Sequence, residues 1–126
     1  MRGRMKRILV VDDSVALRGS VCALLAEEFP GAIVGEAAAA LPAFALIAEE
    51  HWDLVLLDLS LPDRGGVETL RDLRTLRPNL PVVVMSLHPE AEYRSAMRAA
   101  GAIDYISKGS SAKSIAATIR TALGNS

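Results

Sequence analysis

Short runs of consecutive apolar residues alternate along this chain with longer segments in which apolar residues recur every three or four positions. The runs lie at residues 8–11, 33–34, 54–57 and 81–85, and a fifth, interrupted by Asp104, lies at residues 103–106. A short run without an alternating polar face predicts a strand buried on both sides, whereas the longer spacing predicts an amphipathic helix. The pattern therefore predicts five strands, each followed by a helix.

Local signals indicate where these helices begin and end. Serine is a favoured N-cap, proline suits a first turn or the residues beyond a helix, and glycine often stops one. The signals are Ser14, Pro30–Gly31, Pro42, Gly66, Pro78, Gly101 and Ser110 or Ser111, with the fourth helix at about residues 89–100. The predicted inward faces carry Leu17, Val21, Leu24 and Leu25; Phe44, Ile47 and Ala48; Val67, Leu70 and Leu73; and Ile115, Ile119 and Leu123.

The strict alternation of strands and helices favours an α/β fold with a parallel sheet. Right-handed crossovers would then place helices on both faces of that sheet. A length of 126 residues suits one domain. We expect residues 1–5 to form a basic N-terminal arm and residues 6–124 to form the domain, with no effector domain in this chain.

Composition and net charge argue against several classes of function. The net charge of -1 argues against non-specific binding of nucleic acid or of an anionic membrane by the domain. No apolar run approaches the roughly 20 residues that span a bilayer, and residues 8–11 are too short for a secretory signal. The single cysteine, Cys22, cannot form an internal disulfide and is predicted to pack on a helix face. This cysteine usage fits a reducing cytoplasm, which is the predicted location.

Polar residues follow four of the predicted strands: Asp12–Asp13, Asp58, Ser86 and Lys108. The carboxyl ends of parallel strands share one edge, where α/β sheets bind their ligands. Three carboxylates gathered there would repel one another unless a cation intervened, and Mg²⁺ prefers oxygen ligands of this kind. A carboxylate, a divalent cation, a lysine and a hydroxyl together suit transfer of a phosphoryl group onto Asp58.

These residues resemble those of the response-regulator receiver domain of two-component signalling. The matching motifs are Val10–Ser14, Asp58–Pro62 with Gly66, Met85–Ser86 and Tyr105–Lys108. The phrases Ile33–Ala37, Ser86–His88 and Ser107–Ser110 are similar to the branch that usually precedes a LuxR-type helix-turn-helix. The resemblance implies a doubly wound, flavodoxin-like (βα)₅ domain with strand order 2-1-3-4-5.

The same resemblance implies a role for each site residue. Asp58 would accept the phosphoryl group from a histidine-kinase phosphohistidine or from a small donor such as acetyl phosphate. Lys108 would bind a phosphate oxygen. The Mg²⁺ ligands would be Asp12, Asp13, Asp58 and the backbone carbonyl of Ser60. Such a domain is a signalling module that catalyses only its own phosphorylation and dephosphorylation.

The resemblance also implies how the signal would end and how it would leave the domain. Ser60 and His88 would flank the path of the hydrolytic water. Ser86 would move toward the phosphoryl group, and Tyr105 would follow from an outward to an inward rotamer. The implied partners are a sensor kinase, a second copy of the chain and an effector domain or protein. The predicted contact surface carries Tyr93, Met97, Arg98 and Tyr105.

Three positions depart from the commonest receiver pattern. Gly109 replaces the proline that often follows the lysine, Leu87 replaces a smaller residue, and residues 38–41 replace a polar turn. Leu87 is therefore expected to crowd the site or to narrow its gate.

Other Asp- or phosphate-based folds fit less well. A haloacid-dehalogenase-type phosphatase needs a second acid at Ser60, and a dinucleotide-binding fold needs a glycine-rich turn after the first strand. A P-loop is absent as well. The alternative that stays open is a phosphorylation-independent interaction module with the receiver fold.

Overall fold

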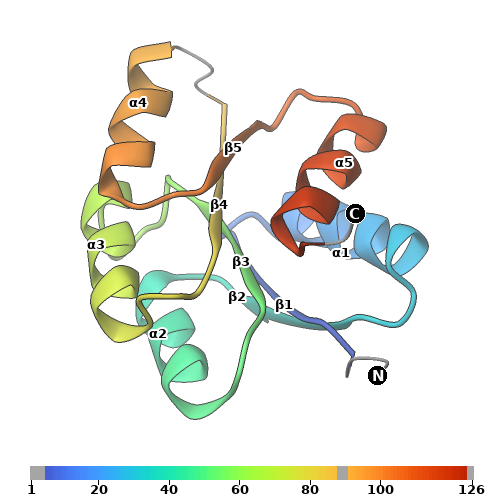
Figure 1. Cartoon of the computed structure of the whole chain (residues 1–126), viewed down its shortest axis with the longest axis horizontal. Helices are drawn as coiled ribbons and strands as arrows, with labels where there is room; N and C mark the ends of the chain where they lie inside the picture. Colours follow the sequence, from blue (N-terminus) through green and yellow to red (C-terminus); the bar gives the residue numbers. More distant parts are fainter. Residues whose placement is uncertain (1–4, 88–90, 125–126) are drawn as a thin grey trace.

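The computed structural model describes residues 5–87 and 91–124, with side chains described outside residues 91–93. Strands and helices alternate throughout these residues (Figure 1). The strands are β1 (Arg7–Val11), β2 (Ile33–Ala37), β3 (Leu54–Asp58), β4 (Val82–Ser86) and β5 (Asp104–Ser107). The helices are α1 (Val15–Glu28), α2 (Ala40–Glu49), α3 (Gly66–Leu76), α4 (Ala91–Ala100) and α5 (Ala112–Ala122).

The strands form one parallel sheet of order β2-β1-β3-β4-β5, as the sequence and the resemblance predicted. β1 lies between β2 and β3, so the chain reverses its direction of travel across the sheet next to β1. β2 is longer than its two-residue apolar run because Gly35, Glu36 and Ala37 pair with β1 as well. The strand order places the ends of β1 and β3 side by side, which positions the candidate site.

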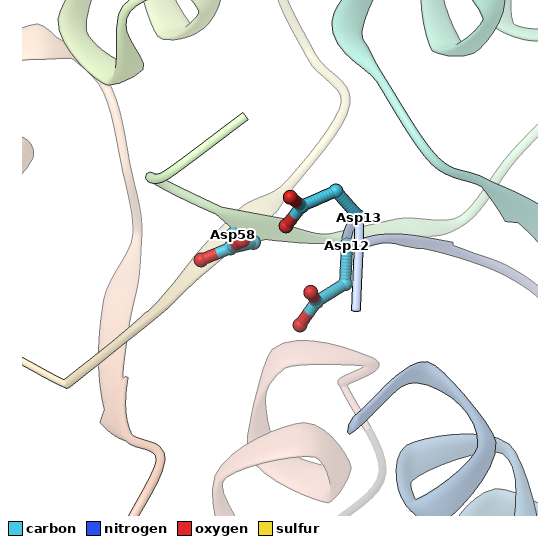
Figure 2. A group of neighbouring side chains, drawn as sticks. All are labelled: Asp12, Asp13 and Asp58. Atoms are coloured by element: carbon cyan, nitrogen blue, oxygen red, sulfur yellow. The ribbon is translucent and has the colours of Figure 1, made fainter. Parts of the chain in front are cut away.

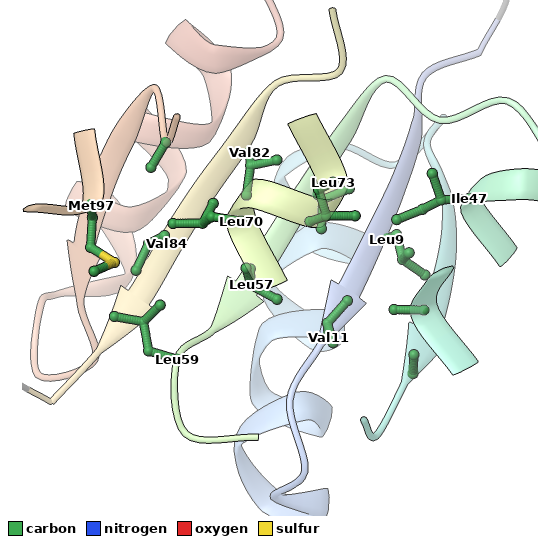
Figure 3. Packing of buried hydrophobic residues seen from close by; sticks show 14 of the residues in the cluster. Leu9, Val11, Ile47, Leu57, Leu59, Leu70, Leu73, Val82, Val84 and Met97 are labelled. Carbon is green, nitrogen blue, oxygen red and sulfur yellow. The ribbon is translucent and has the colours of Figure 1, made fainter. Parts of the chain in front are cut away.

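Alternate strand residues enter two separate cores, one on each face of the sheet. Leu9, Val11, Val55, Leu57 and Val84 face α2, α3 and α4, where they meet residues such as Ile47, Leu70 and Leu73 (Figure 3). Ile8, Val10, Leu54, Leu56 and Val83 face α1 and α5, where they meet Leu25, Ile119 and Leu123. This two-sided burial is why the central strands consist of continuous apolar runs rather than alternating ones.

The predicted helix signals are confirmed at three helix ends. Ser14 caps α1 and Ser111, rather than Ser110, caps α5, each accepting a backbone N–H three residues later. Gly101 follows α4 with a φ of 119°, a conformation that glycine adopts without steric cost. Its N–H donates to the carbonyl of Arg98, and the next N–H donates to that of Met97. These are the two bonds of a Schellman motif, which satisfies the last carbonyls of the helix.

Two predicted inward residues are wrong. Ala48 is exposed, because α2 buries Ala40, Ala43 and Ile47, and position 48 lies outside that stripe. Leu17 is 37% exposed because it borders a cavity between α1 and α5 rather than packing against the sheet.

Cys22 packs, partly buried, against the core under α1 and α5, as predicted. Burial raises the pKa of its thiol, with a further contribution from nearby Glu36, so the thiol form is favoured.

Among the described residues, no helix has the length and apolarity that a membrane crossing requires.

Candidate functional site

The carboxyl ends of β1, β3 and β5 bring three acids and a lysine together. Asp12 and Asp13 directly follow β1, Asp58 is the last residue of β3, and Lys108 directly follows β5. One carboxylate oxygen from each acid lies within 4.8 Å of the others, and the three side chains converge in Figure 2. The predicted convergence of these residues at one sheet edge is confirmed.

The ammonium group of Lys108 bridges two of these carboxylates. Its Nζ lies 2.8 Å from Oδ1 of Asp58 and 3.2 Å from Oδ2 of Asp12. Only 10% of the lysine side chain is exposed, against 3% for Asp58 and 1% for Asp12. Burial is the largest single influence on the pKa of Lys108 and acts to lower it, but Asp58 and Asp12 together raise that pKa above its usual value. Lys108 is therefore held as a cation at neutral pH.

Asp12 is fixed on several sides, whereas Asp13 faces solvent. Oδ1 of Asp12 accepts the Ser14 N–H at 2.9 Å, and the Asp12 N–H donates to the carbonyl of Ala37 at 3.0 Å. The Asp12 carbonyl accepts a hydrogen bond from the guanidinium of Arg18 at 2.7 Å. Asp13 is exposed, so the acid cluster is buried on the side of Asp12 and open to solvent on the side of Asp13.

The arrangement suits a divalent cation. The three carboxylates carry a formal charge of -3 and Lys108 carries +1, which leaves a charge of -2 at the cluster. Carboxylate oxygens are the ligands that a hard cation such as Mg²⁺ prefers. Asp12, Asp13 and Asp58 could therefore hold such an ion, with Asp13 on the solvent side.

Ser86 ends β4 beside this cluster and is 2% exposed. Its carbonyl accepts the N–H of Lys108 at 2.8 Å, so the serine and the lysine are joined through the main chain. Ser86 pairs with Ser107 across the sheet, and Tyr105 pairs with Val84 two residues earlier in β4. The register therefore places Ser86 and Tyr105 on neighbouring strands, and Lys108 directly follows the strand of Tyr105.

The predicted contact surface is partly wrong. Met97 is 2% exposed and belongs to the core, because α4 turns that position toward the sheet. The ring of Tyr105 is 7% exposed and packs inward, with the guanidinium of Arg94 at 5.3 Å from its centroid. Arg98 is exposed and lies near Asp104. The side chain of Tyr93 lies outside the described residues.

The loop from residue 59 to 65 connects Asp58 to α3. Leu59 is buried in the core, and Ser60 is exposed two residues after Asp58. A Cβ at Gly66 would lie 2.6 Å from Cδ2 and 3.2 Å from Cβ of Leu59, so the limited space favours glycine there, at a backbone φ outside the left-handed region.

The other departures from the receiver pattern do not disturb the acids or the lysine. Leu87 is 70% exposed, so the expectation that it crowds the site is wrong, and the alternative that it narrows the gate stays a prediction. No peptide bond in the described residues is cis, and the Lys108–Gly109 bond is trans. His88 lies outside the described residues, and its role stays a prediction.

Sequence reasoning missed Arg18 and Asp63. Arg18 contacts the Asp12 carbonyl and also pairs with Glu36 at 2.9 Å. Asp63 accepts hydrogen bonds from the N–H groups of Ala40 and Leu41, at the start of α2. The absence of a capping side chain at residues 38–39 was the only sequence signal that another residue supplies that cap.

Known proteins resemble the chain over most of its length. It is 38% identical over 104 residues to the protein-glutamate methylesterase/protein-glutamine glutaminase of Rhizobium etli, covering 81% of this chain and 30% of that protein. It is 32% identical over 116 residues to the response regulator GacA of Pseudomonas aeruginosa, covering 92% of this chain and 54% of that protein. The chain thus spans about a third to a half of the length of these relatives.

A solved structure agrees with both the fold and the sequence. The two-component response regulator of the LuxR family from Aurantimonas superposes with a TM-score of 0.88 at 32% identity, covering 95% of this chain and 86% of that one. The family model described as "response regulator receiver domain" matches residues 8–120. This match includes every acid of the cluster and Lys108, and the chain belongs to the response regulator receiver domain family.

Proposed function

We propose that this chain is a phosphorylation-activated receiver in which Asp58 accepts the phosphoryl group. The observation that carries this proposal is the bridge from Lys108 to Asp58 and Asp12, at the edge where three carboxylates meet. A buried acid that is paired with a lysine and adjoins a cation site combines a nucleophile with the positive charge that phosphoryl transfer requires.

The transfer exchanges one bond to phosphorus for another. An oxygen of Asp58 forms a P–O bond while the P–N bond of a kinase phosphohistidine breaks, and the imidazole nitrogen that leaves keeps the electron pair. With acetyl phosphate, a P–O bond breaks and acetate leaves instead. Lys108 neutralises charge on the phosphoryl oxygens, because its ammonium already lies 2.8 Å from the attacking carboxylate. Bound Mg²⁺ would supply further charge neutralisation at the same oxygens.

Asp12, Asp13 and Asp58, with the backbone carbonyl of Ser60, would hold that Mg²⁺. Asp12 has little freedom to move, because its amide, its carbonyl and one carboxylate oxygen are each hydrogen-bonded. Asp13 has the exposure that a ligand facing solvent needs. The charge of -2 at the cluster equals in magnitude the charge of one divalent ion, so the proposed ion would bring the cluster to neutrality.

Mass spectrometry after incubation with acetyl phosphate and Mg²⁺ tests the acceptor. One phosphoryl group is expected on the wild-type protein and on Glu27→Gln, an exposed control on α1. Asp58→Asn should carry none. A wild-type protein that stays unmodified would favour the phosphorylation-independent interaction module, and an Asp58→Asn protein modified at full yield would mean that the acceptor is another residue.

The proposed output route runs through Ser86 and Tyr105. A phosphoryl group on Asp58 would offer the Ser86 hydroxyl a hydrogen bond to a charged acceptor, worth about 1.5–3 kcal/mol. Tyr105 lies on the neighbouring strand, and its ring is packed between the sheet and Arg94. A shift of Ser86 would therefore act on a ring that is already inward, and Arg94 is the exposed residue that would report it.

NMR with beryllofluoride, which imitates the phosphoryl group, tests this route. We expect shifts at Ser86, at Tyr105 and along α4 near Arg94. Changes confined to the loop after Asp58 would contradict the coupling. The partners that would produce and read this change are a sensor histidine kinase, a second copy of the chain, and an effector domain or protein such as a transcriptional regulator.

A further inference from the structure

Helix α2 begins without a capping side chain of its own. Its N-cap residue is Ala39, which offers no side-chain oxygen, and its first turn holds no acid. The first amides of a helix have no partner within the helix and need an acceptor from elsewhere. At α2 that acceptor is Asp63, whose Oδ1 lies 2.8 Å from the N–H nitrogen of Ala40 and whose Oδ2 lies 2.9 Å from that of Leu41.

Asp63 belongs to the loop that follows the proposed acceptor. It lies five residues after Asp58 and three after Ser60. Leu59 fixes the start of this loop in the core, and Arg64 fixes its end through an ion pair of 2.6 Å with Asp72 of α3. Asp63 adds a connection in a different direction, to a helix that precedes β3 in the chain.

The start of α2 is also linked to the segment that carries Asp12 and Asp13. Ala40 follows the end of β2 by three residues, and the carbonyl of Ala37 at that end accepts the N–H of Asp12 at 3.0 Å. Asp12 in turn contacts Lys108, which contacts Asp58. These contacts, together with the chain segments between them, form a closed ring around the acid cluster. Asp63 is the residue of this ring that joins the loop after Asp58 to the start of α2.

We infer that Asp63 is a positioning residue for the cation site, holding the Ser60 segment of the loop against α2 so that the Ser60 carbonyl can bind the ion that Asp12, Asp13 and Asp58 would hold. This inference rests on the proposed function, because it assigns Asp63 a part in forming the proposed Mg²⁺ site. Asp63 does not itself belong to the acid cluster, which consists of Asp12, Asp13 and Asp58.

The chemistry of the contact suits such a tether. A carboxylate at a helix N-terminus gains from the helix dipole as well as from the hydrogen bonds. The two amides engage one oxygen each, which fixes the orientation of the carboxylate plane. The hydrogen bond from Leu41, followed by that from Ala40, lowers the pKa of Asp63, so the charged acceptor persists at neutral pH.

Three variants distinguish a positioning role of Asp63 from its role as a helix cap and from the effect of its charge. Asp63→Ala removes the tether and the cap together. Asp63→Asn keeps a side-chain oxygen that can accept from the helix but removes the charge. Ala39→Ser in the Asp63→Ala background supplies a local cap, since Ala39 already has the extended backbone of an N-cap residue. That double variant restores the helix start without restoring the tether.

Mg²⁺ titration by calorimetry gives the main readout, with urea unfolding of each variant alongside. We expect Asp63→Ala to weaken Mg²⁺ binding about tenfold, the low end for residues that orient metal ligands. Asp63→Asn should bind with an affinity closer to that of the wild type. The double variant should regain stability toward urea and keep the weakened Mg²⁺ affinity of Asp63→Ala.

Three results would overturn the inference while leaving the proposed function intact. In the first, the double variant regains wild-type Mg²⁺ affinity, which would mean that Asp63 serves only as a helix cap. In the second, Asp63→Ala binds Mg²⁺ as tightly as the wild type. In the third, Asp63→Asn binds Mg²⁺ as weakly as Asp63→Ala. A wild-type protein that binds no Mg²⁺ would overturn the inference and the proposed cation site together.

Discussion

Replacing Lys108 by methionine removes the cation that bridges Asp12 and Asp58. The side chain keeps most of its length and its apolar stem, so the change is chiefly one of charge. The formal charge of the cluster moves from -2 to -3, because the ammonium of Lys108 no longer offsets one of the three carboxylates. We expect opposite effects on two quantities: the protein loses stability without Mg²⁺, and it binds Mg²⁺ more tightly.

The distances set the size of the first effect. At an effective dielectric constant of about 20, charges 2.8 Å and 3.2 Å apart attract by about 6 and about 5 kcal/mol. Much of this attraction is offset by the desolvation of groups that are 10% exposed or less. Removing one partner of a buried pair costs about 3–5 kcal/mol, and we expect a loss of that order in chelator.

Urea unfolding in EDTA and calorimetric titration with Mg²⁺ measure the two effects. Lys113→Met is the matched control, because Lys113 is an exposed residue of α5. The control should change neither quantity. The electrostatic reasoning is refuted if Lys108→Met is as stable in EDTA as Lys113→Met, or if it binds Mg²⁺ more weakly than the wild type.

Two further predictions concern packing and pH. A Cβ at Gly35 would lie 2.4 Å from the ring of Trp52. Gly35→Ala should therefore lower the unfolding free energy by about 1–3 kcal/mol and shift the tryptophan emission. Unchanged values of both would mean that the ring moves away without cost. The hydrogen bonds from Leu41 and Ala40 lower the pKa of Asp63 in the folded state. The contribution of Asp63 to stability is therefore fully present above its unfolded pKa of about 3.9, and it is lost as the pH falls through the lower pKa of the folded state. The stability difference between wild type and Asp63→Asn should therefore shrink below about pH 4, and a constant difference down to strong acid would contradict the assignment.

The sequence predicted the sheet and the acid cluster because both follow from short-range pattern and from one topological rule. Continuous apolar runs identify strands that are buried on both faces, and a parallel sheet brings the ends of those strands to one edge. Asp12, Asp58 and Lys108 could therefore be assigned to one site although up to 96 residues separate them. The identity of each side chain, an acid or a lysine, already indicates its chemistry.

Predictions failed where the outcome depends on how one helix is rotated against the sheet. The sequence of α4 alternates small, polar and apolar residues, and it does not reveal that Met97 faces inward while Arg98 stays exposed. Ala48 is a similar case, because alanine is apolar enough for either face of α2. The packing of neighbouring elements decides such positions.

Arg18 and Asp63 escaped prediction for a different reason, which bears on how the site is built. Each acts on main-chain groups of another segment: Arg18 on the carbonyl of Asp12, and Asp63 on the amides of Ala40 and Leu41. Every residue has such groups, so no residue type marks the partner in the sequence, and only the folded chain shows which carbonyl or amide is met. The acids and Lys108 supply the charge of the site, while these main-chain contacts fix where its loops lie. Substitutions of the two kinds should therefore differ in effect: loss of an acid or of the lysine changes the charge of the cluster, whereas loss of Asp63 leaves that charge in place and alters the position of the loop that completes it.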